Sequence, residues 1–188
     1  AEQQAGADYK LALQASPDYC FPFRLESIGV LKRAIARNAS DARAPYYLGN
    51  LLYDLQPAEA VALWEKSRTL DPSYAMVHRN LGLAYESRKG DHAKSIASLE
   101  EAFRLSNDPR FLNELDTERE LAGVDARKRL DFLLKHDKAV LDRDDTLARK
   151  IELHVQLGDY DKALELLQSR IFHVWEGASV TAHDSYVN

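Results

Sequence analysis

The chain contains few residues that interrupt helices and almost no cysteine. Its 188 residues include eight glycines, six prolines and one cysteine, Cys20, so no disulfide can form within the chain. No apolar stretch is long enough to cross a bilayer, and no charged-then-apolar leader opens the sequence. Since free thiols suit a reducing compartment, we expect a cytoplasmic protein with no membrane association.

The sequence also lacks an excess of positive charge. A net charge of -5 argues against general nucleic-acid binding, which requires a basic face. The 45% of apolar residues argues against disorder, because a folded core can form. The six histidines lack metal-ligand spacing, and there is no HExxH, CxxC, Gly-x-Ser-x-Gly or phosphate-binding glycine loop. We therefore predict no catalytic, cofactor-binding or metal-binding residue and no enzymatic activity.

Apolar residues recur at spacings of three and four almost everywhere, which is typical of amphipathic helices. Pro72 and Pro109 separate successive segments because proline cannot continue a helix, and Gly90 and Gly158 indicate tight turns. The predicted helices are 26–38, 42–55, 57–70, 74–88, 91–106, 109–121, 125–136, 144–157 and 160–170.

An internal repeat runs through this helical pattern. Tyr-Leu-Gly at 47–49 is followed 33 residues later by Asn-Leu-Gly at 80–82, and a second predicted helix follows each. The pattern resembles the tetratricopeptide repeat, a helix–turn–helix unit of about 34 residues. The resemblance includes Ala60 and Trp64 in the first copy and Ala102 in the second. Glycine and alanine at these positions let paired helices approach closely.

The resemblance implies an all-α fold, a right-handed superhelix of antiparallel helix pairs (α-α superhelix). We expect an N-terminal cover segment over 1–25, the helical array over 26–170, and a C-terminal cap or truncated continuation over 171–188. Clear units are predicted at 42–72, 74–109 and 144–170, and a divergent pair at 109–136 in the middle.

The first helix of each pair forms the inner wall of such a superhelix, and its polar side chains are candidate partner contacts. We predict a partner-binding groove formed by Tyr46, Asn50, Tyr53, Arg79 and Asn80. Tyrosine and arginine would anchor a partner, and the asparagines would bind its backbone. Asn50 and Asn80 resemble two positions of the carboxylate clamp of some relatives, although Tyr46 stands where a lysine is expected. The alternative is a solvated polar wall without a ligand.

Other local features have structural interpretations. The segment 19–23 would cover the helix at 26–38, and Cys20 would need a neighbouring base to act as a nucleophile. The basic run 127–129 reads as a solvated face. The acidic pair Asp144-Asp145 reads as a helix start, where negative charge is favourable.

A narrower resemblance rests on Pro17–Glu26 and Arg170–Gly177, together with 46–53 and 77–82. These stretches resemble large bacterial proteins of unknown function in which a repeat array follows a β-sandwich similar to galactose mutarotases. The resemblance implies that the chain is part of a larger protein with carbohydrate-related biology.

The C-terminal stretch has two interpretations. His173, Trp175 and Glu176 could form a sugar platform, or apolar side chains could cover the last helix pair. The apolar side chains are Ile171, Phe172, Val174 and Trp175.

These observations predict a non-catalytic scaffold within a larger bacterial protein. Its partner would be a protein segment or another domain of the parent chain, with no nucleic acid and no cofactor. One alternative is an auxiliary helical domain of a carbohydrate-active enzyme that contributes to sugar binding. A second alternative is weak self-association through the apolar ends of the array.

Overall fold

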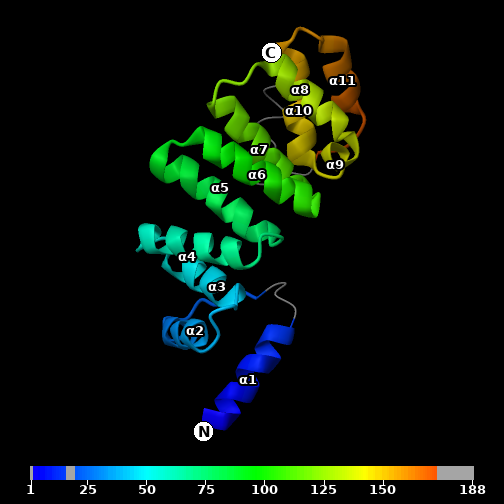
Figure 1. Cartoon of the computed structure of the whole chain (residues 1–188). Coiled ribbons are helices and arrows are strands. Elements are labelled where there is room, and N and C mark those ends of the chain that lie inside the picture. The colour runs from blue at the N-terminus through cyan, green and yellow to red at the C-terminus, as the bar shows by residue number, and fades with distance from the viewer. Residues whose placement is uncertain (1, 16–19, 173–188) are drawn as a thin grey trace. The chain divides into compact units, whose positions relative to one another are not determined.

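A computed structural model describes residues 2–15 and 20–172, and over these ranges it contains helices and connections but no strand (Figure 1). The helices are α1 (Glu2–Gln14), α2 (Glu26–Arg37), α3 (Arg43–Leu52), α4 (Pro57–Leu70), α5 (Ala75–Lys89), α6 (His92–Ser106), α7 (Pro109–Leu121), α8 (Ala126–Lys135), α9 (Asp137–Leu141), α10 (Asp144–Gln156) and α11 (Tyr160–Gln168). The nine predicted helices agree with α2 to α8, α10 and α11 to within three residues at each end. The short helix α9 and the extent of α1 were not predicted.

Residue contacts divide the chain into two compact units, Ala1–Leu81 and Gly82–Asn188, and the division falls within α5. In the first unit α3 packs against both α2 and α4. The core residues Leu48, Leu52 and Ala60 are almost fully buried. The partly buried side chains around them are Ile28, Leu31, Ile35, Tyr53 and Leu63. The apolar faces of α2, α3 and α4 thus form one small core.

Gly49 allows α3 and α4 to approach closely. A Cβ atom at Gly49 would lie 2.5 Å from Nε1 of Trp64 and 3.1 Å from the carbonyl oxygen of Ala60, both on α4. No side chain larger than hydrogen fits there without displacing the indole. Gly82 has the same role in the second unit, where a Cβ would lie 2.7 Å from Cγ of Leu99.

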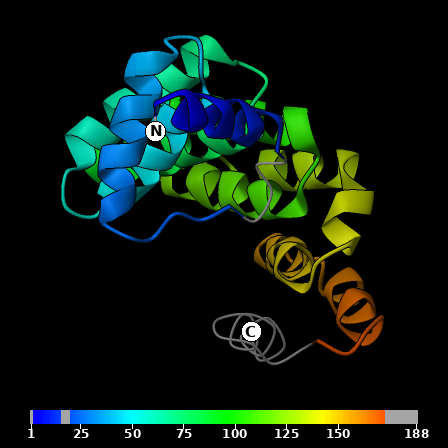
Figure 2. The ribbon, with the colours of Figure 1, turned by 90° about the horizontal axis from the view of Figure 1, so that it is seen from below.

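The N-terminal residues pack differently from the predicted cover. The hydroxyl of Tyr9 on α1 donates to the carbonyl oxygen of Val30 on α2 at 3.4 Å, and Figure 2 shows α1 in dark blue beside α2. Phe21 and Phe23, however, are 68% and 80% exposed. The prediction that the segment 19–23 covers the helix at 26–38 is therefore wrong for both phenylalanines.

In the second unit α6 packs against α7, and α10 contacts α7, α8, α9 and α11. Figure 2 shows the pair α10 and α11 in gold and orange. The largest fully buried side chains of this unit are Leu99, Leu112, Leu115, Leu130, Leu133, Val140, Leu147, Ile151 and Leu153. Helix α10 therefore packs against four of the other helices of this unit.

Charged groups are also buried in the second unit. Asp116 on α7 is fully buried and Arg129 on α8 is 3% exposed. The carboxylate of Asp116 accepts from Nε and Nη2 of Arg129 at 3.1 and 2.7 Å, and from Nε of Arg149 on α10 at 3.0 Å. The prediction that the run 127–129 is a solvated basic face is therefore wrong at Arg129, because α7 supplies two acidic partners for it, Asp116 and Glu120.

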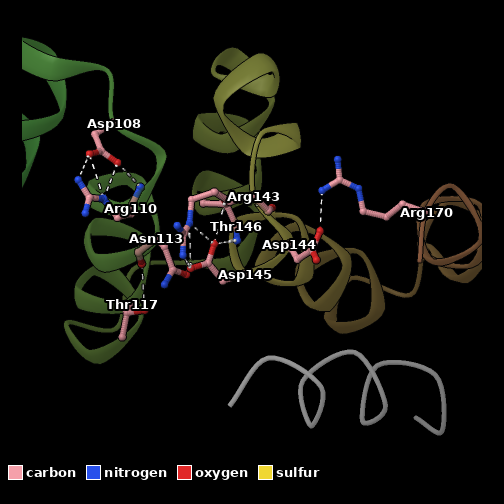
Figure 3. A network of polar contacts seen from close by, with 9 residues as sticks. All are labelled: Asp108, Arg110, Asn113, Thr117, Arg143, Asp144, Asp145, Thr146 and Arg170. Carbon is pink, nitrogen blue, oxygen red and sulfur yellow. Dashed lines mark hydrogen bonds and ion pairs between the residues drawn. The ribbon is translucent and has the colours of Figure 1, made fainter. Parts of the chain in front are cut away.

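Polar contacts fix two helix starts in the second unit (Figure 3). At the start of α7, the carboxylate of Asp108 accepts from the backbone N–H of Arg110 at 2.9 Å, an N-cap contact. Helix α10 begins at Asp144, as predicted for a helix start, and Arg170 donates to this carboxylate at 2.7 Å. Because Arg170 follows α11, this contact joins the two ends of the α10–α11 pair.

Candidate functional site

Polar side chains of α3 and α5 meet within the first unit. The amide nitrogen of Asn80 donates to Oδ1 of Asn50 at 2.9 Å, and Nη1 of Arg79 lies 3.5 Å from Oδ1 of Asn80. Asn50, Arg79 and Asn80 are all partly buried. The structure therefore brings together three of the five predicted contact residues, and we name these three the amide cluster.

A buried tryptophan orients the amide cluster. Nε1 of Trp64 on α4 donates to Oδ1 of Asn50 at 3.0 Å and to the carbonyl oxygen of Tyr46 at 3.2 Å. An indole N–H can only donate, so the oxygen of the Asn50 amide must face Trp64 and its nitrogen must face away. Within the residues that the structure describes, no protein group accepts from this nitrogen. Its two N–H bonds are therefore available to an external acceptor.

This role of Trp64 was not predicted, since the residue was interpreted only as a packing position of the repeat. The sequence nevertheless contained a signal from which this contact could have been predicted. A buried indole N–H almost always has an acceptor, and a polar residue on the preceding helix was needed to supply one.

Tyr46 is placed differently from its predicted role. It is 5% exposed, and its ring centroid lies 5.2 Å from that of Tyr47 and 4.8 Å from that of Tyr74. Because so little of its side chain reaches the surface, Tyr46 offers a partner little contact area. Its ring instead packs with those of Tyr47 and Tyr74, and its carbonyl oxygen accepts from Trp64, so it helps to position the residues of the site.

The tyrosines beside Tyr46 stay un-ionised. Burial raises the pKa of Tyr74, and the neighbouring Tyr46 and Tyr47 hydroxyls raise it further. Burial also raises the pKa of Tyr47, to which a hydrogen bond with the thiol of Cys20 adds. Neither hydroxyl is a base at physiological pH, so this group cannot activate Cys20 as a nucleophile.

Tyr53 directly follows α3, three residues beyond Asn50, and is partly buried. Its ring centroid is 4.9 Å from that of Trp64, and it packs against the core formed by Leu48, Leu52 and Ala60. The fifth predicted residue thus borders the amide cluster through Trp64, with part of its ring at the surface.

Neither a metal site nor a membrane span is present in the described part of the chain. No group of three or more histidine, cysteine, aspartate or glutamate residues there could hold a metal ion. No helix there has the length and apolarity needed to cross a bilayer.

The C-terminal candidates fall mostly beyond the described ranges. His173, Trp175 and Glu176 lie outside the described residues, so the sugar platform stays a prediction. Ile171 is described and is 89% exposed, so it does not cover the last helix pair as predicted.

Part of this helical array matches a known protein family. Residues 51–109, from the end of α3 through α6, match the family model of the tetratricopeptide repeat. Helices α4, α5 and α6 lie within this range, with Pro57 and Pro109 at helix starts. The chain has the tetratricopeptide-repeat fold. The predicted fold class, an all-α array of tetratricopeptide-like helix pairs, is thereby confirmed.

Three solved structures illustrate the likeness. The crystal structure of YrrB, a tetratricopeptide-repeat protein with an unusual peptide-binding site, is 20% identical with a TM-score of 0.62, and the match covers 75% of this chain and 73% of that one. MamA from Desulfovibrio magneticus RS-1 is 18% identical, with a TM-score of 0.62 and coverage of 87% and 92%. Pseudomonas aeruginosa pilF is 16% identical, with a TM-score of 0.63 and coverage of 88% and 75%. Identities this low show that the folds are alike but carry no information about function.

Proposed function

We propose that this chain is a non-catalytic tetratricopeptide-repeat scaffold that binds an extended protein segment at the amide cluster. The observation that carries the proposal is the orientation of the Asn50 amide. Its oxygen is occupied by Trp64 and Asn80, so it presents two N–H donors and no free acceptor. A peptide carbonyl oxygen is the complementary group, since every residue of an extended segment carries one.

Arg79 and Tyr53 fit the same role. Arg79 lies beside Asn80, so its guanidinium gives the cluster a positive charge. Tyr53 supplies an aromatic surface one turn from Asn50. The peptide-binding site of YrrB, which shares this fold, agrees with such a function.

The partner in this proposal is a protein segment or another domain of the same parent chain. The resemblance to large bacterial proteins with a β-sandwich domain favours the interdomain form, in the cytoplasm. A repeat array would then hold two parts of one protein in a fixed relation, which needs no catalytic residue in the array itself.

The amide cluster permits a test that separates binding from folding. Asn50→Asp keeps an oxygen that accepts from Trp64 and Asn80 but removes both N–H donors. Peptides would be selected from a random displayed library on the immobilised wild-type chain, synthesised with a fluorescent label, and titrated by anisotropy. We expect Asn50→Asp to bind them at least about tenfold more weakly, because a carboxylate repels a carbonyl oxygen.

The control is Lys66→Ala, which truncates an exposed side chain of α4 outside the amide cluster and should bind like the wild type. Circular dichroism would establish that both variants are folded. Selected peptides that bind the Asn50→Asp variant as tightly as the wild type would contradict the proposed site. Failure to select any peptide would contradict the function.

A further inference from the structure

A pocket lies in the unit Gly82–Asn188, and none of the predicted contact residues lines it. It has a volume of about 400 Å³ and is formed by the last part of α7, the loop after it and one face of α8. Its lining residues are Arg119, Val124, Lys128, Asp131, Phe132 and Lys135. Neither the repeat pattern nor the amide cluster assigns a function to these residues.

The pocket carries positive charge on an acidic protein. The lining contains three cations, Arg119, Lys128 and Lys135, and one acid, Asp131. The whole chain, in contrast, has a net charge of -5. Lys128 and Lys135 are exposed, and no ion pair within the described residues neutralises either of them. Arg119 pairs with Glu100 on α6 at 2.6 Å. The two lysines are therefore the unpaired cations of the pocket.

An aromatic group organises the same pocket. The guanidinium carbon of Arg119 lies 3.7 Å from the ring centroid of Phe132, a close cation–π contact. The ring of His136 lies 4.7 Å from that of Phe132, and the ring of Phe103 lies 5.0 Å from that of His136. With Val124, the Phe132 ring gives the pocket an apolar surface between its cations.

The titration of His136 reports the same local charge. Burial lowers its pKa, and the charges of Arg119 and Lys135 lower it further. The same positive charge that disfavours protonation of His136 would favour the binding of an anion.

We propose that this pocket binds an acidic protein segment in which an apolar side chain lies between two carboxylates. Lys128 and Lys135 lie seven residues apart on α8, about 10 Å along the helix axis. In an extended segment, same-face side chains recur about every 6.8 Å, so acids four positions apart are about 14 Å apart. Flexible lysine side chains span the difference, and the intervening apolar side chain contacts Phe132 and Val124.

Charge and size favour a protein segment over a nucleic acid. The net charge of -5 repels a long polyanion, whereas a pocket of about 400 Å³ accommodates only a few side chains. This inference does not depend on the proposed function of the amide cluster, because the two sites share no residue and lie in different units.

The probe is a fluorescein-labelled peptide, Gly-Glu-Ser-Leu-Ser-Glu-Gly, titrated with the full chain by anisotropy at about 50 mM salt, where surface charges are less screened. Two comparison peptides replace both glutamates by lysine or the leucine by serine. We expect saturable binding of the acidic peptide below about 1 mM, at least about tenfold weaker binding of the serine version, and no binding of the lysine version.

Charge-reversal variants test the location. Lys128→Glu with Lys135→Glu should weaken binding at least about tenfold. The matched control, Arg127→Glu with Lys138→Glu, makes the same change in net charge at exposed positions on α8 and α9 outside the pocket lining and should stay within about twofold of the wild type. Equal losses in the two double variants would overturn the proposal.

Two further results would also overturn it. One is the absence of binding by the acidic peptide. The other is tighter binding of a labelled ten-nucleotide oligothymidine that the peptide displaces, which would assign the pocket to nucleic acid. Peptide binding in the pocket should also raise the pKa of His136, followed by its ring proton signals in NMR spectra.

Discussion

The side-chain oxygen of Asn50 on α3 accepts the indole N–H of Trp64 on α4 at 3.0 Å, and this contact couples a surface donor to the helix-pair core. Trp64 is almost fully buried, so its position is fixed by packing. The orientation of the Asn50 amide follows from that position, because only its oxygen can accept from an indole. The proposed binding group is therefore held in place by a residue that is itself buried.

Replacement of Asn50 by alanine should cost stability as well as binding. Asn50→Ala removes one of the two acceptors of the Trp64 N–H and the oxygen that accepts from the Asn80 amide, so we expect a loss of about 1 kcal/mol in the free energy of unfolding. Urea unfolding followed by Trp64 fluorescence, in a Trp175→Phe background, measures it. Asn50→Asp keeps the acceptor and should lose less than half as much; equal losses would contradict the role of the oxygen.

Gly49 should tolerate no side chain. Gly49→Ala places a methyl group 2.5 Å from Nε1 of Trp64, and we expect overpacking to lower the free energy of unfolding by about 1–3 kcal/mol. Gly29 on α2 is the matched control, because a Cβ there would meet only the end of the Arg33 side chain, 3.9 Å from its Nη1. Gly29→Ala should instead stabilise by about 0.5–1 kcal/mol through helix propensity. The two urea midpoints should shift in opposite directions, and a neutral Gly49→Ala would contradict the close approach.

The helices themselves could be predicted from the sequence because their signals are local. Apolar spacing, Pro57 and Pro109 at helix starts, and the paired Gly49 and Gly82 each act within one helix or one helix pair. The five-residue helix α9 was missed because it is too short to show a helical period.

The site was only partly predictable, because its contacts join helices that are distant in the sequence. Counting along α3 and α5 placed Asn50 and Asn80 on one wall, and the structure joins them directly. The same counting could not show that Tyr46 is buried against Tyr74, because Tyr74 occupies none of the repeat positions on which the prediction was based. It also could not show that Arg129 reaches a buried Asp116, since local sequence does not record which charges face each other across helices.

The buried pair of Arg129 and Asp116 should be sensitive to removal of one partner. Arg129→Met removes one of the two arginines that the structure places against the fully buried Asp116 and leaves Arg149, and we expect a loss of about 3 kcal/mol, measured by urea unfolding followed by circular dichroism. The double variant Arg129→Met with Asp116→Leu removes both charges and should be more stable than Arg129→Met alone. If the double variant is the less stable of the two, the cost does not come from an unpaired buried charge.

The pH dependence of stability should change at Glu120. Burial alone would raise the pKa of this carboxyl group, but hydrogen bonds from Arg149 at 2.6 Å and Arg129 at 2.8 Å outweigh it and lower the pKa below its ordinary value of 4.5. A lowered folded-state pKa contributes stability that is present above the unfolded value and is lost as the pH falls through the folded value. The wild type should therefore lose stability on acidification below about pH 4.5, and part of this loss should belong to Glu120.

Glu120→Gln removes the titrating group while keeping a side chain of the same shape, so its urea midpoint should fall less steeply than that of the wild type between about pH 5 and pH 3. The control Lys66→Gln makes a charge change of the same size at a group that does not titrate in this window, and it should keep the wild-type profile. Parallel profiles for Glu120→Gln and the wild type would mean that the two arginines do not stabilise the ionised carboxylate. In that case the charged groups between α7, α8 and α10 would contribute to stability through Asp116 alone.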